Sequence, residues 1–305
     1  MNFKSIDYFL TVARERSFTK AAALLHITQQ TLSADIAGLE RELGHTLFLR
    51  RVPLQLTYAG EVFLRYALGF QQNFRAMERE FSDISGSQKG LLRIGVSFAR
   101  GRALMPGLID AFQRQYPQME IHLAEASNDQ IHALLMSGEV DLAIANLPQS
   151  AALSLQPFYR EQWVLLIADH LLEQLCAASG QQPSLALEQL RAGDYTLLAE
   201  CPFILGIPDD IGGSFGRQFL RRQRLQPAIR AQSENLDTQL DLCAMGVGAC
   251  FAPQNLIPPT LSELHRIPLP DAEYQIFFGV RKDNYQWQMV NAFIETALRR
   301  QEEKP

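Results

Sequence analysis

The sequence predicts a multidomain α/β protein with an amino-terminal winged helix-turn-helix, a long linker helix and a carboxyl-terminal two-lobed α/β domain. Three observations predict this fold class. Two short amphipathic helices follow one another over 17–44, an apolar stripe with helical spacing continues over 58–85, and strands alternate with helices from residue 91 onward. A chain of 305 residues is also too long for one small core and suits two or three domains.

The second helix of the 17–44 segment has one apolar face. Its large apolar residues recur at steps of four, three and four: Leu32, Ile36, Leu39 and Leu43. Gln29, Gln30 and Ser33 are then expected to point the other way, near the amino end of the helix. In a helix-turn-helix that end meets base edges in the major groove, where glutamine can pair with adenine. A plain helical hairpin inside a core remains the alternative for this segment.

Other residues around this segment are expected to contact phosphates. Thr28 is a candidate N-cap, which places the free backbone N–H groups of the helix near a phosphate. The stretch 45–56 resembles a wing with two adjacent arginines at its tip; a solvated charged turn is the alternative. The candidate DNA-binding residues are Lys20, Thr28, Gln29, Gln30, Thr31, Ser33, Arg50 and Arg51.

A long helix is predicted from Thr57, its candidate N-cap, to about Ser85. Its large apolar residues approximate a heptad seam and are the candidate dimerisation residues: Phe63, Phe70, Phe74, Met77, Phe81 and Ile84. A lone helix of this length cannot bury such a stripe, so the same helix of a second subunit is the expected partner. Packing against the body of the same chain is the alternative.

From residue 86 to 90 the sequence GSQKG predicts a hinge, after which strands and helices alternate. Strands are expected at 91–97, 119–126, 141–146 and 163–169, with helices at 104–116 and 129–137. A second α/β unit follows, with helices at 185–192, 215–223 and 236–245 and strands at 195–199, 228–231 and 246–253. A strand at 276–282 then rejoins the first unit before a last helix at 285–300. The predicted domains are 1–57, 58–86 and 87–305, the last with lobe I at about 91–163 and 268–305 and lobe II at about 164–267.

Two α/β lobes joined by two crossings leave a cleft, a layout similar to periplasmic solute-binding proteins. Ligands in such folds bind beyond the carboxyl ends of strands, near helix amino termini. The candidate cleft residues are Ser97, Phe98, Ala99, Arg100, Arg102, Ser127, Asn128, Asn146, Cys201, Phe203, Ser233, Glu234, Asn235 and Phe251. A hydroxyl and free amides at Ser97 suit a carboxylate, and Arg100 with Arg102 favours a small organic anion as ligand.

Composition limits the chemistry of the chain. The net charge of −5 divides into +2 for residues 1–90 and −7 for the remainder, so DNA binding has to rest on a local basic patch. The four cysteines, Cys176, Cys201, Cys243 and Cys250, lack C-x-x-C spacing and fit reduced thiols, so neither a metal site nor a cofactor is expected. There is no signal-peptide pattern or run of 18 apolar residues, which predicts a cytoplasmic protein without membrane contact.

The segment 3–63 resembles the amino-terminal domain of LysR-type transcriptional regulators. It carries S-F-T-K-A-A, T-Q-Q-T-L-S, L-E-R-E-L-G, L-F-L-R-R and L-T-Y-A-G in the order and spacing of that family. The resemblance implies an effector domain of the periplasmic-binding fold, a dimer or a dimer of dimers, and allows contact with RNA polymerase. Two departures bear on the DNA sequence that is read: Gln30 replaces a proline or small residue, and Ala34 and Asp35 follow Ser33 where a basic residue is common.

Two other function classes remain open at this point. An enzyme would need a catalytic motif, but Gly246 and Gly248 form only a short G-x-G without the third glycine of a dinucleotide site. Cys201 before Pro202 could be a reactive thiol, although no positive residue lies beside it in the sequence. The other class is a cytoplasmic small-molecule-binding protein with an appended helical interaction domain.

Overall fold

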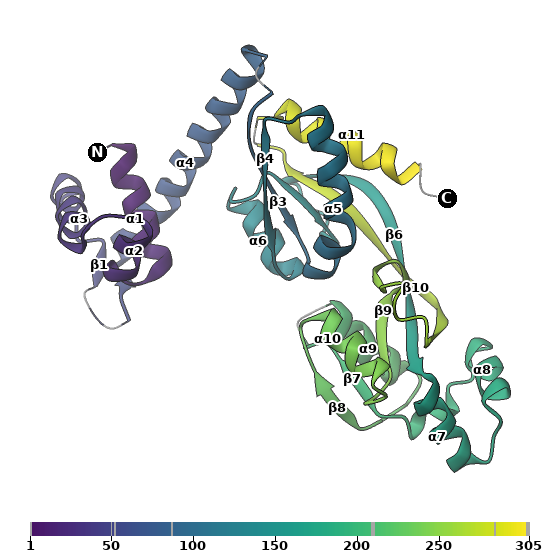
Figure 1. Cartoon of the computed structure of the whole chain (residues 1–305). Helices are drawn as coiled ribbons and strands as arrows, with labels where there is room; N and C mark the ends of the chain where they lie inside the picture. The colour runs from purple at the N-terminus through teal and green to yellow at the C-terminus, as the bar shows by residue number, and fades with distance from the viewer. Residues whose placement is uncertain are drawn as a thin grey trace. The chain divides into compact units, whose positions relative to one another are not determined.

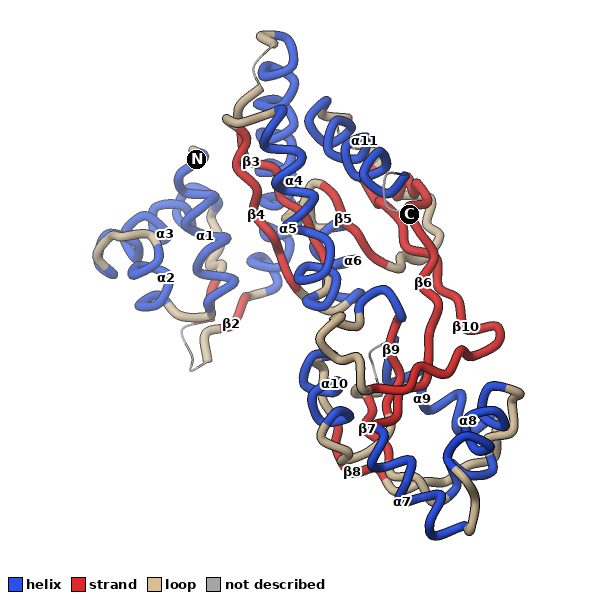
Figure 2. Tube along the Cα trace, turned by 45° about the vertical axis from the view of Figure 1, so that its right-hand side comes forward, coloured by secondary structure: helices blue, strands red, loops and turns tan. Residues whose placement is uncertain are grey.

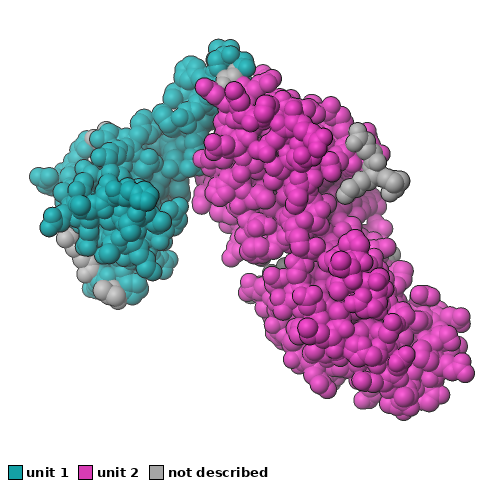
Figure 3. All heavy atoms as spheres, in the orientation of Figure 1, with its two compact units in different colours: residues 1–87, 284–287 teal, residues 88–283, 288–305 magenta. Residues whose placement is uncertain are grey.

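The computed structural model describes residues 2–49, 51, 53–86, 88–208, 211–283 and 285–302, without the side chains of Ile211 and Asp271. The chain forms two compact units, coloured separately in Figure 3. The first comprises residues 1–87 and 284–287, and the second comprises 88–283 and 288–305. In the described part of the chain, no helix is both long and apolar enough to cross a membrane.

The first unit is a winged helix-turn-helix continuous with a long helix (Figure 1). Its elements are α1 (Phe3–Glu15), α2 (Phe18–Leu24), α3 (Gln29–Leu43), β1 (Phe48–Leu49), β2 (Gln55–Leu56) and α4 (Tyr58–Ile84). Each helix begins at a residue whose side chain accepts a backbone N–H of the first turn: Asn2, Ser17, Thr28 and Thr57. These N-caps are local signals, which is why the helix starts can be predicted from the sequence.

One apolar core holds this unit together. It is built from α1, the stripe of α3, the wing and the first turns of α4, with Phe9 fully buried at its centre. The ring of Phe63 meets Phe9 edge to face, with centroids 4.7 Å apart. Leu32, Ile36 and Leu39 are buried as their spacing predicts, whereas Leu43, the last residue of α3, is exposed. The turn between α2 and α3 passes through His26, whose φ of 53° lies in the left-handed region.

The wing is tied to the helices on both sides of it. The Glu40 carboxylate of α3 accepts the backbone N–H of Leu47 at 2.6 Å and that of Phe48 at 3.3 Å. The Thr57 hydroxyl donates to the carbonyl oxygen of Thr46 at 2.7 Å. Gly60 completes the joint, because a Cβ built there would overlap the carbonyl oxygen of Leu47. The wing, α3 and the start of α4 therefore form one rigid body.

Two of the six candidate dimerisation residues of α4 pack within the first unit. Phe63 is buried in the core of its own unit, and the ring of Phe74 lies 4.6 Å from that of Phe3 in α1. Helix α1 packs along α4 and covers this side of it, which the spacing within α4 alone does not reveal. The large exposed apolar residues of α4 from Tyr66 onward, here called the α4 seam, are Tyr66, Phe70, Met77, Phe81 and Ile84.

The second unit has the two α/β lobes that the alternating pattern predicts (Figures 1 and 2). Lobe I contains β3 (Gly90–Val96), α5 (Phe98–Gln115), β4 (Met119–Glu125), α6 (Asn128–Met136), β5 (Leu142–Ala145) and α11 (Gln288–Glu302). Lobe II contains α7 (Asp169–Ser179), α8 (Pro183–Arg191), η1 (Thr196–Ala199), β7 (Phe203–Leu205), α9 (Ile211–Arg222), β8 (Ile229–Gln232), α10 (Leu236–Ala244), β9 (Cys250–Pro253) and η2 (Gln254–Leu256).

Two long antiparallel strands, β6 (Leu153–Ala168) and β10 (Leu264–Arg281), run from one lobe into the other. The six-stranded sheet has the order β4-β3-β5-β10-β6-β9. Strands β3, β4 and β5 are parallel to one another, with β4 and β5 on either side of β3. Strand β5 pairs antiparallel with the lobe I portion of β10, and β9 pairs antiparallel with the lobe II portion of β6. A register break between Pro268 and Glu273 marks the place where the strands leave one lobe for the other.

Several predicted elements differ from those observed. Residues 195–199 form no strand but a turn of 3-10 helix, because the Asp194 carboxylate accepts both the N–H and the hydroxyl of Thr196. Helix α7 was not predicted, and β10 begins at Leu264 rather than at residue 276. Helix α5 begins at Phe98 rather than at residue 104, so Phe98, Ala99, Arg100 and Arg102 lie in the helix itself.

We expect Gly60→Ala to destabilise the first unit by about 1 to 3 kcal/mol, because the added methyl group forces α4 away from Leu47. Gly69→Ala in the same helix is the matched control, since a Cβ at Gly69 meets nothing within 4 Å. That change should leave stability unchanged or raise it by up to about 1 kcal/mol. Urea unfolding followed by helical circular dichroism measures both. Equal stability of the two variants would contradict the close approach at Gly60.

Candidate functional site

The amino end of α3 carries the candidate DNA-reading side chains. Thr28 caps the helix, and its hydroxyl lies 2.9 Å from that of Thr31. Gln30 is exposed on the side opposite the buried stripe. Gln29 is also exposed, but its amide oxygen accepts the Thr19 hydroxyl of α2 at 3.1 Å. Ser33 is half-buried, so the predicted outward direction holds for Gln30 and only in part for Gln29 and Ser33.

The candidate phosphate contacts flank this helix end. Lys20 is exposed on α2, and Arg51 is exposed between the two strands of the wing. Strands β1 and β2 pair antiparallel, with Phe48 opposite Leu56, so the hairpin predicted as a wing is present. Arg50, the other predicted wing arginine, lies outside the described residues.

The first unit also has an apolar groove at the start of the α4 seam. Its volume is about 550 Å³, and it is lined by Leu43, His45, Leu47, Tyr58, Ala59, Val62, Phe63, Tyr66 and Phe70. Tyr58 is 80 % exposed and Tyr66 is 63 % exposed. Large apolar side chains that lie together and remain exposed are typical of a surface that binds a partner. The groove and the α4 seam thus form one continuous unpartnered apolar face.

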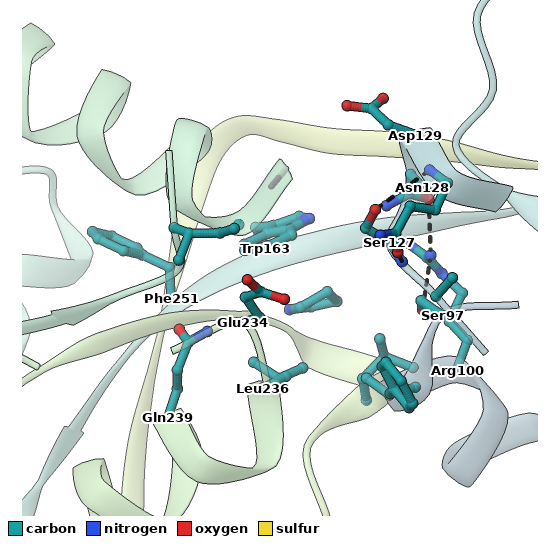
Figure 4. A pocket seen from close by; sticks show the side chains of 18 residues that line it. Ser97, Arg100, Ser127, Asn128, Asp129, Trp163, Glu234, Leu236, Gln239 and Phe251 are labelled. Carbon is teal, nitrogen blue, oxygen red and sulfur yellow. Dashed lines mark hydrogen bonds between the residues drawn. The ribbon is translucent and has the colours of Figure 1, made fainter. Parts of the chain in front are cut away.

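A cavity of about 360 Å³ lies between the two lobes of the second unit (Figure 4). It is lined by Ser97, Phe98, Ala99, Arg100, Ala126, Ser127, Asn128, Asp129, Gln130, Trp163, Ile207, Gly212, Glu234, Leu236, Gln239, Phe251, Pro253 and Leu256. The amino ends of α5 and α6 supply the lobe I wall, and the turn before α10 supplies much of the lobe II wall. Ser97, Ser127 and Asn128, which follow the ends of β3 and β4, are among the residues that line the cavity.

Arg100 lines this cavity, but its charge is already neutralised. Its guanidinium donates to both carboxylate oxygens of Glu161 at 2.8 Å, and both side chains are almost fully buried. The same guanidinium donates to Ser97 at 3.1 Å and to Asn128 at 3.4 Å, and the Tyr159 hydroxyl donates to Glu161 at 2.9 Å. Burial alone lowers the pKa of Arg100, but the Glu161 carboxylate raises it above the ordinary value.

Burial, together with the Glu161 carboxylate, raises the pKa of Tyr159 well above its ordinary value. The network therefore holds a charged Arg100 and a neutral Tyr159 at physiological pH. Arg102 is paired as well: it contacts Asp237 at 2.9 Å and donates to the Leu256 carbonyl at 2.9 Å. The argument for an anionic ligand from these two arginines consequently loses its basis.

Three predicted residues lie beside the cavity and hold its walls. Asn146 donates its backbone N–H to Asn128 at 3.2 Å. Asn235 caps α10, and its own N–H is accepted by the Ser233 hydroxyl at 3.1 Å. Ser233 and Asn235 thereby fix the turn that presents Glu234 to the cavity.

Cys201 and Phe203 were predicted in the cleft, but both are fully buried in the lobe II core. The prediction was wrong because it assumed a strand at 195–199 that ended just before them. Burial raises the pKa of the Cys201 thiol to about 12, which is the opposite of what a reactive thiol requires. Phe251, the third aromatic residue of the prediction, does line the cavity.

Sequence reasoning missed Trp163 as a cavity residue. It sits in β6 where the strand enters lobe II, and it packs against Phe215 with ring centroids 5.0 Å apart. Its indole Nε1 is buried and has no hydrogen-bond partner in the described chain. The one feature of the sequence that could have indicated its role is its position, a tryptophan where the chain crosses between the two predicted lobes.

Comparisons with known proteins match both units. Residues 3–61 match the family described as bacterial regulatory helix-turn-helix protein, lysR family, and residues 85–302 match the LysR substrate binding domain. The uncharacterised HTH-type transcriptional regulator YcgK of Bacillus subtilis is 31% identical over 83% of this chain and 80% of its own. The HTH-type transcriptional activator IlvY of Haemophilus influenzae is 26% identical over 96% and 98% of the two chains.

Among solved structures, full-length CbnR complexed with its target DNA is similar in fold. The TM-score is 0.63 at 22% identity, over 98% of this chain and 99% of CbnR.

We expect Arg100→Met to destabilise the second unit by about 3 to 5 kcal/mol, because it leaves the Glu161 carboxylate buried without its partner. Arg102→Met is the control, since its ion pair is partly exposed and should cost about 0 to 1 kcal/mol. Replacing Glu161 by Gln in the Arg100→Met background should recover part of the loss. Urea unfolding measures all three variants, and equal losses for the two arginines would contradict the proposed role of burial.

Proposed function

The chain belongs to the LysR family of transcriptional regulators, and we propose that it acts as a homodimer that reads a two-fold symmetric DNA site. The capped amino end of α3, with Gln30 exposed beside it, is the observation that carries this proposal. CbnR, which is similar over nearly its whole length, has been solved with its target DNA, which supports the same use of this unit.

In the proposed complex the first turn of α3 enters the major groove. Gln30 pairs with a base edge there, while Gln29, held by Thr19, approaches from the flank. The Thr28 cap leaves backbone N–H groups of the helix end near a phosphate. Lys20, Thr31, Ser33, Arg50 and Arg51 complete the proposed DNA surface.

The α4 seam is the proposed dimer contact. Phe70, Met77, Phe81 and Ile84 are each more than 40 % exposed, and a second copy of the same helix offers them matching apolar partners. Dimerisation places two α3 helices on one duplex. The dimer then binds DNA more tightly than a single DNA-binding unit does. A dimer of dimers on neighbouring sites extends the same arrangement.

The cavity between the lobes is the proposed effector site, with Ser97, Phe98, Ala99, Arg100, Ser127, Asn128 and Phe251 among its contacts. An effector shifts the arrangement of the DNA-binding units only if it binds one arrangement more tightly than another. We further propose that the protein works in the cytoplasm and catalyses no reaction. RNA polymerase is the proposed partner through which effector binding changes transcription.

Fluorescence anisotropy tests the DNA-binding proposal. The purified chain is titrated against the DNA immediately upstream of its own gene and against scrambled DNA of equal length, at two salt concentrations. Tighter binding to the native fragment at both salts supports sequence-dependent recognition. Weak binding that is alike on both fragments and is lost at higher salt would leave only electrostatic attraction and contradict the proposal.

For Gln30→Ala we expect relaxed base preference at one position of each half-site, with a loss of about 1 to 3 kcal/mol on the native sequence. The slope of affinity against salt should stay the same, because glutamine carries no charge. Binding that weakens equally on every sequence would show that Gln30 does not read a base.

For Phe81→Glu we expect monomers by light scattering, because the change puts a charge at a seam position that is 60 % exposed in the single chain. Arg65→Glu introduces the same side chain on another side of α4, where Arg65 is exposed, and should leave the dimer intact. An unchanged mass for Phe81→Glu would overturn the assignment of the seam.

A further inference from the structure

The two walls of the cavity between the lobes offer opposite hydrogen-bonding chemistry. On the lobe I side, Ser97 is the N-cap of α5, yet its side chain accepts no N–H of that helix. The first N–H groups of α5 are therefore not capped by a side chain, and they form the positive end of an 18-residue helix. The Ser97 oxygen accepts from Arg100, so its hydroxyl hydrogen is available to a ligand.

A second donor lies in β6, where the strand enters lobe II, and points toward the lobe I wall. The indole Nε1 of Trp163 is buried without a partner, and Figure 4 shows this end of the ring directed toward Ser127. Trp163 is 5 % exposed, so its N–H is buried without an acceptor among the described residues. The Ser97 hydroxyl, the α5 backbone and this indole together suit a carboxylate group.

The lobe II wall carries the opposite polarity. Glu234 is the middle residue of the turn fixed by Ser233 and Asn235, and Figure 4 shows its carboxylate between Trp163 and Leu236. Two exposed carboxylates line the cavity, Asp129 on the lobe I wall and Glu234 on the lobe II wall. Among the described lining residues, Arg100 is the one cation, and Glu161 neutralises it. The Glu234 carboxylate therefore faces the cavity without a matching cation from the described lining, which suits an ammonium group.

We infer that the effector of this chain is a small zwitterion, an amino acid or a close analogue with an apolar side chain. This inference rests on the proposed function, in which the cavity is the effector site. The effector carboxylate lies at the amino end of α5 and near Trp163, and its ammonium group pairs with Glu234. The apolar side chain packs against Phe251, Leu236 and Leu256, which share the same cavity.

Glu234 is the specificity-determining residue of this assignment. A carboxylate without an amine would satisfy the lobe I donors but would face the Glu234 charge across the cavity. An amine without a carboxylate would satisfy Glu234 but leave the Trp163 N–H unpaired. A ligand with both groups contacts both lobes at once. It therefore stabilises one angle between the lobes more than a ligand that carries only one of the two groups.

Matched ligands test the assignment through tryptophan fluorescence. The chain has two tryptophans, so a Trp287→Phe background leaves Trp163 as the single reporter. The probes are phenylalanine, 3-phenylpropionate and phenethylamine, and an aliphatic set of leucine, 4-methylpentanoate and 3-methylbutylamine. In at least one set, the amino acid should bind about tenfold or more tighter than both of its one-charge analogues.

Two isosteric variants separate the role of Glu234 from a general charge effect. Glu234→Gln should weaken amino acid binding about tenfold while leaving the carboxylate-only probe equal or tighter. Glu200→Gln, which removes an exposed lobe II carboxylate outside the cavity, should change neither.

Three results would each overturn the inference: an analogue with one charge that binds as tightly as the amino acid, no effect of Glu234→Gln, or no binding of any probe at millimolar concentration. DNA binding by the same sample is measured in parallel. Intact, sequence-dependent DNA binding together with any of these results rejects the zwitterion alone. Loss of sequence-dependent DNA binding in the unmodified chain rejects the proposed function itself.

Discussion

The second unit depends on one backbone constraint: β6 and β10 are continuous through both lobes. Neither lobe can change its angle to the other without bending these two strands at the place where they cross. The register break after Pro268 lies at that place, and there side-chain amides supplement the strand ladder. Gln162 donates to the Leu269 carbonyl at 2.7 Å and Gln275 donates to the Tyr159 carbonyl at 3.0 Å. The two strands therefore pass between the lobes through a short irregular segment beside the cavity.

The buried Arg100–Glu161 pair connects this crossing to the cavity wall. Glu161 lies in β6 at the crossing, and Arg100 lies in the first turn of α5, where it also reaches Ser97 and Asn128. A ligand that engages Ser97 thus contacts a side chain only one hydrogen bond away from the ion pair. The pair also neutralises the positive charge that Arg100 places at the cavity.

Local signals made much of this fold predictable. The N-caps and apolar stripes of α3 and α4, and the strand-end polar residues of lobe I, act over a few residues and can be read from the sequence alone. Partners distant in the chain could not be read in this way. Arg100 finds Glu161 61 residues later, and Phe63 turns inward because α1 happens to cover that side of α4. Cys201 and Phe203 were misplaced because Asp194 starts a 3-10 turn where the apolar run favoured a strand.

Helix α4 has one consequence for how such a protein can change during evolution. Its first turns are locked to the wing through Thr57 and Gly60, while the α4 seam begins at Tyr66 on the same uninterrupted helix. A single residue inserted between them would rotate the α4 seam by about 100° relative to the winged helix-turn-helix. Seven residues would bring it back to within about 20°. In the proposed dimer, an insertion in α4 therefore keeps the two α3 helices aligned only when its length restores the helical phase, as about 7 or about 11 residues do.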